Sequence, residues 1–277
     1  MAQFKIGVCE FSFPCRGPIA IGMASEAGFD GVQIADCMGS DEGYALSNPY
    51  VQDCYLKASE EHKVELQAMH LQRLMTQGFL KKSPKSPEGQ IARESLSKAA
   101  LACHQMGIKT MMVTVIRIAN REEYEYVVDH MKYGVEECAK YGISFAQEND
   151  FSSGYFHQMR QDVGDGLKLC FDTMNTVVNG IGYPEDELDK FGLDCIDHFH
   201  VKDCVENEAG YMTKYTTPFR LIGEGHTHMK EWAQKVKKTD FSGWVMSENF
   251  YFDKVYGGKD FIELAKQDVK TLHDALD

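Results

Sequence analysis

The sequence lacks the cysteine patterns of disulfide-stapled domains and zinc knuckles. Its nine cysteines are odd in number, and no two of them form a Cys-x-x-Cys pair. Cys170 and Cys195 lie inside apolar runs, where cysteine acts as a small buried hydrophobe. No Cys/His pairing supports a cysteine nucleophile. We therefore expect reduced cysteines, as in a cytoplasmic protein.

Long apolar runs and a basic excess are also absent. Runs such as 111–113 are far shorter than the roughly 20 residues that span a bilayer. The first residues show no basic stretch leading into an apolar one, so we expect neither a signal peptide nor a membrane partner. The 29 basic and 42 acidic side chains give a formal charge of −13. Such a chain repels phosphate backbones, so we expect no nucleic-acid partner, although charge alone does not exclude a buried, metal-assisted site.

Short β-rich runs alternate along the chain with longer helical patterns, which is typical of βα units around a parallel sheet. Eight such runs are the number that closes a barrel, and barrels of about 250 residues form one domain. Without any linker or low-complexity tract, the sequence predicts a single α/β domain over residues 1–277, a (β/α)₈ TIM barrel. The expected strands are residues 4–9, 31–35, 63–70, 109–115, 143–148, 167–172, 196–201 and 244–248.

Helical patterns occupy several of the connections. Pro87 fits the first turn of one helix, and Gly142 fits the end of another. The segments after strands two, six and seven are less regular, and 206–220 is predicted to be a long loop over the end of strand seven, where such loops commonly cover an active site. The expected helices are 47–61, 87–106, 121–141, 229–238 and 258–276.

Polar side chains end several of the apolar strands, at the face where barrels of this kind place their active sites. The last four strands contribute two glutamates, an aspartate and a histidine, which together form a metal-ligand set. We predict a metal site at Glu148, Asp172, His200 and Glu248.

The chemistry of this set favours a hard divalent cation. Three carboxylates and one imidazole suit one Mn²⁺ ion first, with Mg²⁺, Co²⁺ or Zn²⁺ as alternatives. A cation there can bind a carbonyl and a neighbouring hydroxyl of a substrate and stabilise the enediolate formed on proton loss. Glu148 and Glu248, on opposite sides of the site, are the predicted catalytic residues that trade this proton.

Other polar residues have structural as well as functional interpretations. His70 ends strand three and is a candidate to bind substrate or a second metal ion, whereas His198 is expected to be a core histidine one layer below His200. Glu10 is either a site residue or a cap. Lys202 and Asp203 follow the predicted ligand His200, where an aspartate can orient a metal-bound histidine or a lysine.

The spaced pair His226 and His228 looks like a metal motif. It follows Gly-Glu-Gly at a predicted helix start, however, so we expect a structural turn and a helix cap there.

These residues give the chain a resemblance to a known superfamily. Residues 199–203 (FHVKD), 222–225 (IGEG) and 243–248 (GWVMSE) resemble the xylose isomerase-like barrels, which include sugar-phosphate isomerases, ketose 3-epimerases, inosose dehydratases, hydroxypyruvate isomerases and endonuclease IV. The resemblance implies metal binding by Glu148, Asp172, His200 and Glu248, with the two glutamates as acid/base groups. Members are often dimers or tetramers, so the resemblance also allows a homo-oligomer.

The resemblance leaves more than one activity open. Ketose 3-epimerases usually carry a histidine where this chain has Asn175, and an arginine where it has Glu206. Endonuclease IV needs further ligands that strand four does not offer. The first hypothesis is a metal-dependent isomerase or epimerase that acts on a neutral, sugar-like small molecule through a cis-enediolate, with His70, Asn175 and Lys202 on the substrate side. The alternatives are a lyase on the same metal, like inosose dehydratase or a C-glycoside deglycosidase acting on a 3-keto sugar, and a non-catalytic sugar-binding or partner subunit.

Overall fold

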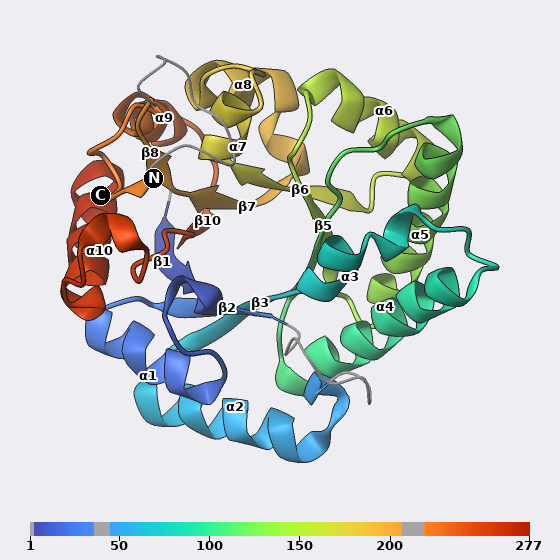
Figure 1. Ribbon diagram of the computed structural model, residues 1–277, viewed down its shortest axis with the longest axis horizontal. Coiled ribbons are helices and arrows are strands. Elements are labelled where there is room, and N and C mark those ends of the chain that lie inside the picture. The colour runs from blue at the N-terminus through green and yellow to red at the C-terminus, as the bar shows by residue number, and fades with distance from the viewer. Residues whose placement is uncertain (1–2, 36–44, 207–218) are drawn as a thin grey trace.

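Eight parallel strands close a barrel in the computed structural model of the chain, which describes residues 3–35, 45–206 and 219–277 (Figure 1). Around the barrel the strand order is β1-β10-β7-β6-β5-β4-β3-β2. All eight predicted strands are present, and the (β/α)₈ fold is confirmed. The barrel strands are β1 (Phe4–Cys9), β2 (Gly31–Ala35), β3 (Glu65–His70), β4 (Thr110–Thr114), β5 (Ser144–Glu148), β6 (Leu167–Asp172), β7 (Ile196–Val201) and β10 (Gly243–Ser247).

Helices surround the barrel on the outside (Figure 1). Within the described ranges they are α1 (Pro18–Ala27), α2 (Pro49–His62), α3 (Gln72–Gln77), α4 (Pro87–Met106), α5 (Arg121–Ala139), α6 (Ser153–Val163), α7 (Thr173–Val178), α8 (Pro184–Phe191), α9 (Met229–Val236) and α10 (Phe261–Leu276). None of these helices is both long and apolar enough to cross a membrane.

The predicted helices agree with the structure where the sequence carries caps. The α4 helix matches its predicted bounds because Ser86 caps its start and Gly107 ends it in a left-handed conformation. The α10 helix starts three residues later than predicted, since Gly257 and Gly258 both have positive φ and Asp260 supplies the N-cap. The α1 helix was not predicted; its sequence, PIAIGMASEA, is apolar on most sides and shows little helical periodicity.

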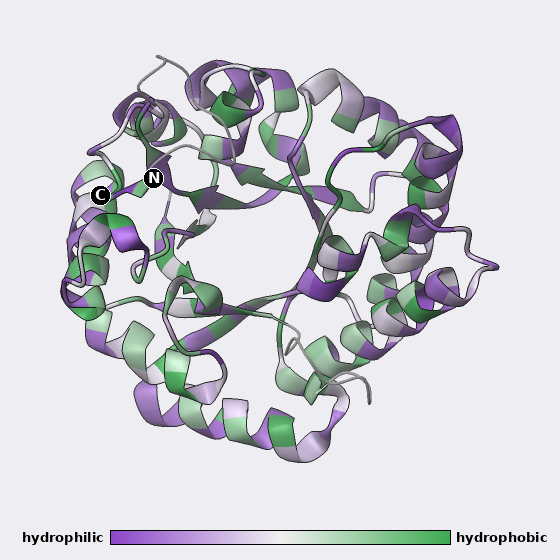
Figure 2. Ribbon diagram, in the orientation of Figure 1, coloured by the Kyte–Doolittle hydropathy of each residue, from purple (hydrophilic) through white to green (hydrophobic). Residues whose placement is uncertain are grey.

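The apolar core lies between the strands and the surrounding helices. In Figure 2, hydrophobic residues line the strands and the helix sides that face them, and hydrophilic residues are more frequent on the outer rim. Phe199 of β7 points into this layer, where its ring packs against Trp232 of α9 at 5.1 Å between centroids. Because side chains alternate along a strand, the neighbours His198 and His200 point into the barrel instead.

Asp203 organises the connection that follows β7. Strands β8 (Asp203–Cys204) and β9 (Phe219–Arg220) pair as a short antiparallel sheet. The predicted loop 206–220 is therefore wrong at its C-terminal end, where residues 219–220 form a strand, and residues 207–218 lie outside the described part of the chain. The Asp203 carboxylate does not orient a lysine or a metal-bound histidine. It accepts hydrogen bonds from the backbone N–H groups of Cys204, Gly223, Gly225 and Thr227 and from the Thr227 hydroxyl, at 2.7–3.2 Å.

A second buried carboxylate, Asp268 of α10, connects the C-terminal helix to the ends of the barrel. It accepts a hydrogen bond from the Ile222 N–H at 2.8 Å and from the Asn249 amide at 3.0 Å. Burial raises the pKa of Asp268 to about 7. Two aspartates thus hold the loop after β7 and the segment after β10 in place.

Gly225→Ala tests the Asp203 anchor. A methyl group at this position would overlap Asp203 Oδ1 and the Cys204 carbonyl oxygen, so we expect the variant to lose about 2 kcal/mol or more of unfolding free energy. Gly154→Ala is the matched control, because a methyl group there meets open space. Urea unfolding measures both variants, and equal stabilities would contradict the role of the anchor.

Asp268→Asn tests whether the buried carboxyl group of Asp268 keeps its proton in the folded protein. The unfolded chain ionises Asp268 near pH 4, whereas the folded protein keeps the proton to about pH 7, so its stabilising contribution is complete below about pH 4 and is lost as the pH rises towards 7. An asparagine cannot ionise. Any cost of placing an amide beside Asn249 does not depend on pH. The unfolding free energy of the variant minus that of the parent should therefore rise between pH 4 and 7. A pH-independent difference in unfolding free energy would refute this assignment.

Candidate metal centre

Four acidic and imidazole side chains converge at the C-terminal ends of four neighbouring strands. Glu148, Asp172 and His200 belong to β5, β6 and β7, and Glu248 directly follows β10. One ligand atom from each lies within 4.8 Å of those from the others, and all four side chains are buried. The structure thus brings together the four residues that the sequence predicts as ligands.

The imidazole of His200 presents its Nδ1 atom to the two glutamates. Nδ1 lies 3.0 Å from Glu248 Oε2 and 3.4 Å from Glu148 Oε1, while Nε2 lies 3.0 Å from Gln33 Oε1 across the barrel. Because the Gln33 carbonyl oxygen can only accept, Nε2 carries a hydrogen, and Nδ1 is the nitrogen that faces the two glutamates. Nδ1 donates to these carboxylates when the ring is protonated and would offer its lone pair to a metal ion that takes the place of that proton. This is the arrangement of a metal-binding histidine whose other nitrogen is held by an acceptor. Gln33 was not predicted, although a glutamine within the buried strand GVQIA is a visible signal.

Lys202 supplies the positive charge in the immediate surroundings of this group. Its Nζ lies 2.7 Å from both Asp172 Oδ2 and Glu248 Oε2, and the side chain is buried. Three carboxylates and one ammonium leave two negative charges when His200 is neutral. Buried charge is costly unless it is paired or coordinates a metal ion, so the residues present fit a divalent cation.

The three carboxyl groups differ in their electrostatic surroundings. Burial, together with Glu248 and Glu148, raises the pKa of Asp172 to about 7. Burial also opposes ionisation of Glu248, but the Lys202 ammonium outweighs it and lowers the pKa of Glu248 to about 2. For Glu148, His200 and Lys202 likewise overcome burial and hold the pKa well below its usual value. Both glutamates are therefore carboxylates at neutral pH, as acceptors of a proton must be.

Buried asparagines follow both glutamates and fix the strand ends. Asn149 hydrogen-bonds the backbone N–H and C=O of Asp172, and Asn249 bonds Asp268 and the Arg220 carbonyl oxygen. These positioning residues were missed by the sequence analysis, although the Glu-Asn dipeptide recurs at the end of β5 and after β10.

A hydrogen-bonded chain connects His70 to Glu148. Thr114 Oγ1 donates to Glu148 Oε2 at 2.8 Å and lies 3.1 Å from His70 Nε2. Burial lowers the pKa of His70 to about 4, so the imidazole is neutral at pH 7. Thr114 was not predicted, although it ends β4 and is the register partner of Glu148.

Asn175 also lies against the cluster. Its backbone N–H donates to Asp172 Oδ1 at 2.8 Å, and its side-chain Nδ2 lies 3.4 Å from Glu148 Oε1. Its Oδ1 atom is buried and has no hydrogen-bond partner among the described residues. Asn175 therefore offers an unpaired acceptor close to the four predicted ligands.

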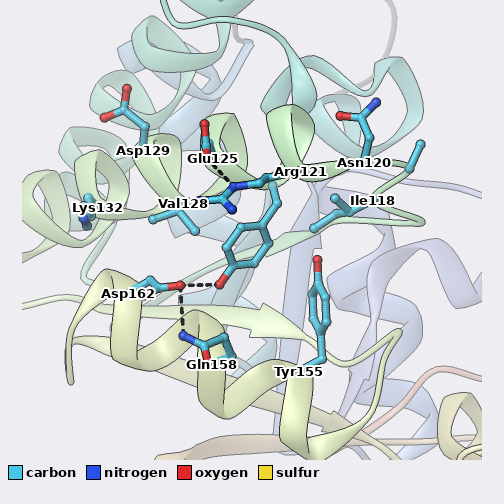
Figure 3. Close-up of a pocket in the computed structure, with 12 residues that line it drawn as sticks. Ile118, Asn120, Arg121, Glu125, Val128, Asp129, Lys132, Tyr155, Gln158 and Asp162 are labelled. Carbon is cyan, nitrogen blue, oxygen red and sulfur yellow. Dashed lines mark hydrogen bonds and ion pairs between the residues drawn. The ribbon is translucent and has the colours of Figure 1, made fainter.

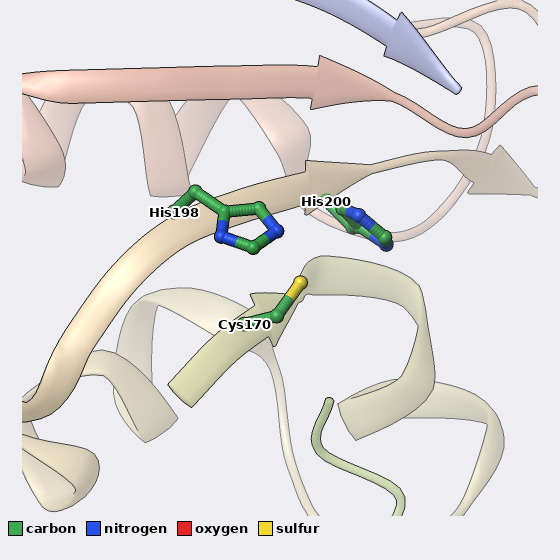
Figure 4. Close-up of side chains that lie close together, drawn as sticks. All are labelled: Cys170, His198 and His200. Carbon is green, nitrogen blue, oxygen red and sulfur yellow. The ribbon is translucent and has the colours of Figure 1, made fainter. Parts of the chain in front are cut away.

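Below this group, Cys170, His198 and His200 form a second set of ligand-type side chains (Figure 4). His198 is fully buried, as expected for a core histidine, and its Nδ1 lies 2.7 Å from Asp197 Oδ1. Burial raises the pKa of the Cys170 thiol well above its usual value, which opposes the thiolate form that a metal ion requires. The set has three members and shares His200 with the carboxylate group, so the carboxylate group is the better candidate metal centre.

Two further predicted residues have structural roles. Glu10 accepts hydrogen bonds from the backbone N–H groups of Ala35 and Gly17 and from the Tyr55 hydroxyl, at 2.9–3.2 Å, in keeping with the capping interpretation. His228 occupies the N-cap position of α9, in agreement with the predicted helix cap, although its side chain makes no capping hydrogen bond.

The backbone of His228 is left-handed, with φ of 57°, and its side chain is held elsewhere. The ring stacks on Tyr183 at 3.6 Å, and Nδ1 lies 2.7 Å from Glu185 Oε1. His226 accepts a hydrogen bond from the Glu206 N–H through Nδ1. The pair therefore forms a structural turn, as predicted, without a side-chain cap.

A surface hollow of about 850 Å³ lies between α5 and α6 (Figure 3). Tyr124 and Gln158 both donate hydrogen bonds to Asp162 Oδ2 on its wall. None of the four candidate ligands lines this hollow, so the hollow is not part of the candidate metal centre.

Comparisons with known proteins agree with this architecture. An Actinoplanes sp. protein, 2-epi-5-epi-valiolone 7-phosphate 2-epimerase, is 23% identical over 227 residues, which cover 80% of this chain and 77% of the relative. The solved IOLI protein with a bound zinc atom is 17% identical, with a TM-score of 0.76 over 98% of each chain. A D-psicose 3-epimerase solved in the presence of D-fructose is 15% identical, with a TM-score of 0.75 over 98% of this chain and 99% of that one.

The two solved structures share the fold of this chain at low sequence identity. The family model described as xylose isomerase-like TIM barrel matches residues 21–274, most of the chain. The chain therefore belongs to the xylose isomerase-like TIM barrel family.

Proposed function

We propose that the protein is a divalent-metal-dependent isomerase or epimerase that moves a proton on a small sugar or keto-polyol. The observation that carries the proposal is the buried group of three carboxylates and one imidazole, whose charge is offset by a single lysine. The Actinoplanes relative, which is an epimerase by name, supports the same reaction class.

In this proposal Glu148, Asp172, His200 and Glu248 hold the ion, with Mn²⁺ preferred and Mg²⁺, Co²⁺ or Zn²⁺ as alternatives. A bound divalent ion supplies a Lewis acid that polarises a substrate carbonyl. Gln33 keeps the Nδ1 atom of His200 directed into the group. Lys202 bridges Asp172 and Glu248 and offers its remaining N–H bond to a substrate oxygen.

The two glutamates are the proposed proton-transfer residues. Around the barrel they stand at the two ends of the arc β10-β7-β6-β5, with the other two proposed ligands between them. One glutamate, as a carboxylate, removes the proton beside a carbonyl. The other, after taking a proton from solvent or from a substrate hydroxyl, delivers it to the opposite face of the resulting enediolate. Two carboxylates on opposite sides of one carbon are what inversion of that centre requires.

The substrate is proposed to be a neutral polyhydroxylated molecule. The unpaired Asn175 Oδ1 is an acceptor, which suits a hydroxyl donor and repels a phosphate oxygen. Asn175 replaces the histidine usual in ketose 3-epimerases, so the bound sugar is expected to differ from theirs.

A lyase on the same site is the second candidate. The specific observation in its favour is Lys202, whose ammonium adjoins Glu248 and can donate a hydrogen bond to a leaving hydroxyl. The glutamate that took the substrate proton returns it to that hydroxyl, which leaves as water, so the same enediolate undergoes elimination in place of inversion.

Metal binding is the first test. The purified protein should bind about one equivalent of Mn²⁺ by calorimetry, and Glu248→Gln should weaken binding and lower activity at least about a hundredfold while keeping its circular dichroism spectrum. Glu61→Gln, on the exposed surface of α2, is the control and should match the parent. A parent protein that binds none of Mn²⁺, Mg²⁺, Co²⁺ or Zn²⁺ would favour the non-catalytic sugar-binding alternative.

A substrate panel in ²H₂O separates the two reactions. Ketoses, inososes and 3-keto-glycosides are incubated with the Mn²⁺-loaded protein and followed by NMR. We expect deuterium to enter one carbon together with a change of configuration or carbonyl position. Deuterium uptake with loss of water or of an aglycone would select the lyase, and no exchange with any compound would contradict both reactions.

A further inference from the structure

The hydrogen-bond chain from Glu148 to His70 has a defined direction. Glu148 is a carboxylate, so it accepts, and the single hydroxyl hydrogen of Thr114 is given to Glu148 Oε2. Thr114 can then only accept from the ring of His70, 3.1 Å away. The hydrogen of the neutral imidazole is therefore on Nε2.

The opposite ring nitrogen of His70 is consequently a bare acceptor. Its Nδ1 atom is buried and has no hydrogen-bond partner among the described residues. Leaving a buried polar atom unpaired is unfavourable, so a ligand that supplies the missing donor gains a hydrogen bond at this atom. The side chain is 3% exposed, so bulk water does not satisfy this atom.

The position of His70 relates this acceptor to the candidate metal centre. It stands at the end of β3, two hydrogen bonds from Glu148. The Phe11 ring lies 6.3 Å away between centroids and adds an apolar neighbour. A donor that meets Nδ1 is therefore held close to the acid/base group.

We propose that His70 binds a substrate hydroxyl through Nδ1 and that Thr114 is a positioning residue, which transmits the orientation of His70 to the Glu148 carboxylate. This inference rests on the proposed function, because it assigns a polyol as the donor. Hydroxyl recognition and the alignment of Glu148 are then coupled through one chain of two hydrogen bonds. Substrates that lack the recognised hydroxyl lose both the contact and part of the alignment.

The tautomer can be measured without any substrate. In the protein labelled with ¹⁵N-histidine and loaded with diamagnetic Mg²⁺, long-range ¹H–¹⁵N correlation at pH 7 should show His70 with a protonated Nε2 and an unprotonated Nδ1. The spectrum of His70→Asn identifies the signal by its loss. A proton on Nδ1, alone or together with one on Nε2, would overturn the inference.

Two matched substitutions of His70 distinguish the roles of its two ring nitrogens. Glutamine places an amide nitrogen near the position of Nε2 and keeps the bond to Thr114, whereas asparagine places an amide oxygen near Nδ1 and keeps the acceptor. With a substrate from the panel, His70→Gln should raise KM about threefold to tenfold at little cost in kcat, since one hydrogen bond to the substrate is lost. His70→Asn should keep KM and lower kcat. Identical losses in both variants would mean that His70 only fills space.

Two substitutions of Thr114 test its positioning role. Thr114→Val keeps the shape but removes the hydroxyl from Glu148, so kcat should fall about tenfold, and Thr114→Ser should restore it. Loss of activity in the serine variant as well would contradict the positioning role. If no sugar in the panel reacts, the proposed function fails, and the tautomer measurement still decides whether His70 offers an acceptor.

Discussion

The buried convergence of three carboxylates is the constraint on which the site depends. Glu148, Asp172 and Glu248 lie within a few ångströms of one another at the C-terminal ends of the barrel strands, where they are buried from water. Lys202 offsets one charge, and His200 directs Nδ1 at the two glutamates. In the proposed function, a divalent cation would offset the remaining charge and take Nδ1 as a ligand. The two glutamates would then be the groups that transfer the proton.

The barrel creates this convergence, and its loops maintain it. Parallel strands end at one face, and alternation of side chains directs residues of neighbouring strands to the same interior. The strand ends are then fixed by buried polar groups: Asn149 and Asn249 directly after the two glutamates, Asp203 under the IGEG segment, and Asp268 from the last helix. Each of these groups satisfies backbone or amide hydrogen bonds that loops at a barrel end would otherwise leave unpaired. Stability and site geometry therefore depend on the same residues.

Much of this arrangement could be predicted from the sequence, for identifiable reasons. The strands are short apolar runs between helical patterns, and the ligands are charged residues that end those runs, so Glu148, Asp172, His200 and Glu248 stood out. Gln33 and Thr114 were missed because a polar residue in a strand does not reveal its hydrogen-bond partner, which here lies 167 or 34 positions away in the sequence. The sequence predicts the helix cap at His228 but not the contacts of its side chain, because Tyr183 and Glu185, which hold its ring, come from a distant part of the chain. Local pattern therefore predicts which residues reach the site, whereas tertiary contacts decide their hydrogen bonds.

The central claim is that the four convergent residues hold a divalent ion and that the deeper cysteine and histidine set does not. Anomalous X-ray scattering from crystals grown with Mn²⁺ and measured near the manganese absorption edge tests it most directly. One strong peak is expected within coordination distance of Glu148, Asp172, His200 Nδ1 and Glu248, with Lys202 displaced or retained beside it. A peak on Cys170 and His198, or no peak at the carboxylates when Mn²⁺ saturates the crystal, would contradict it.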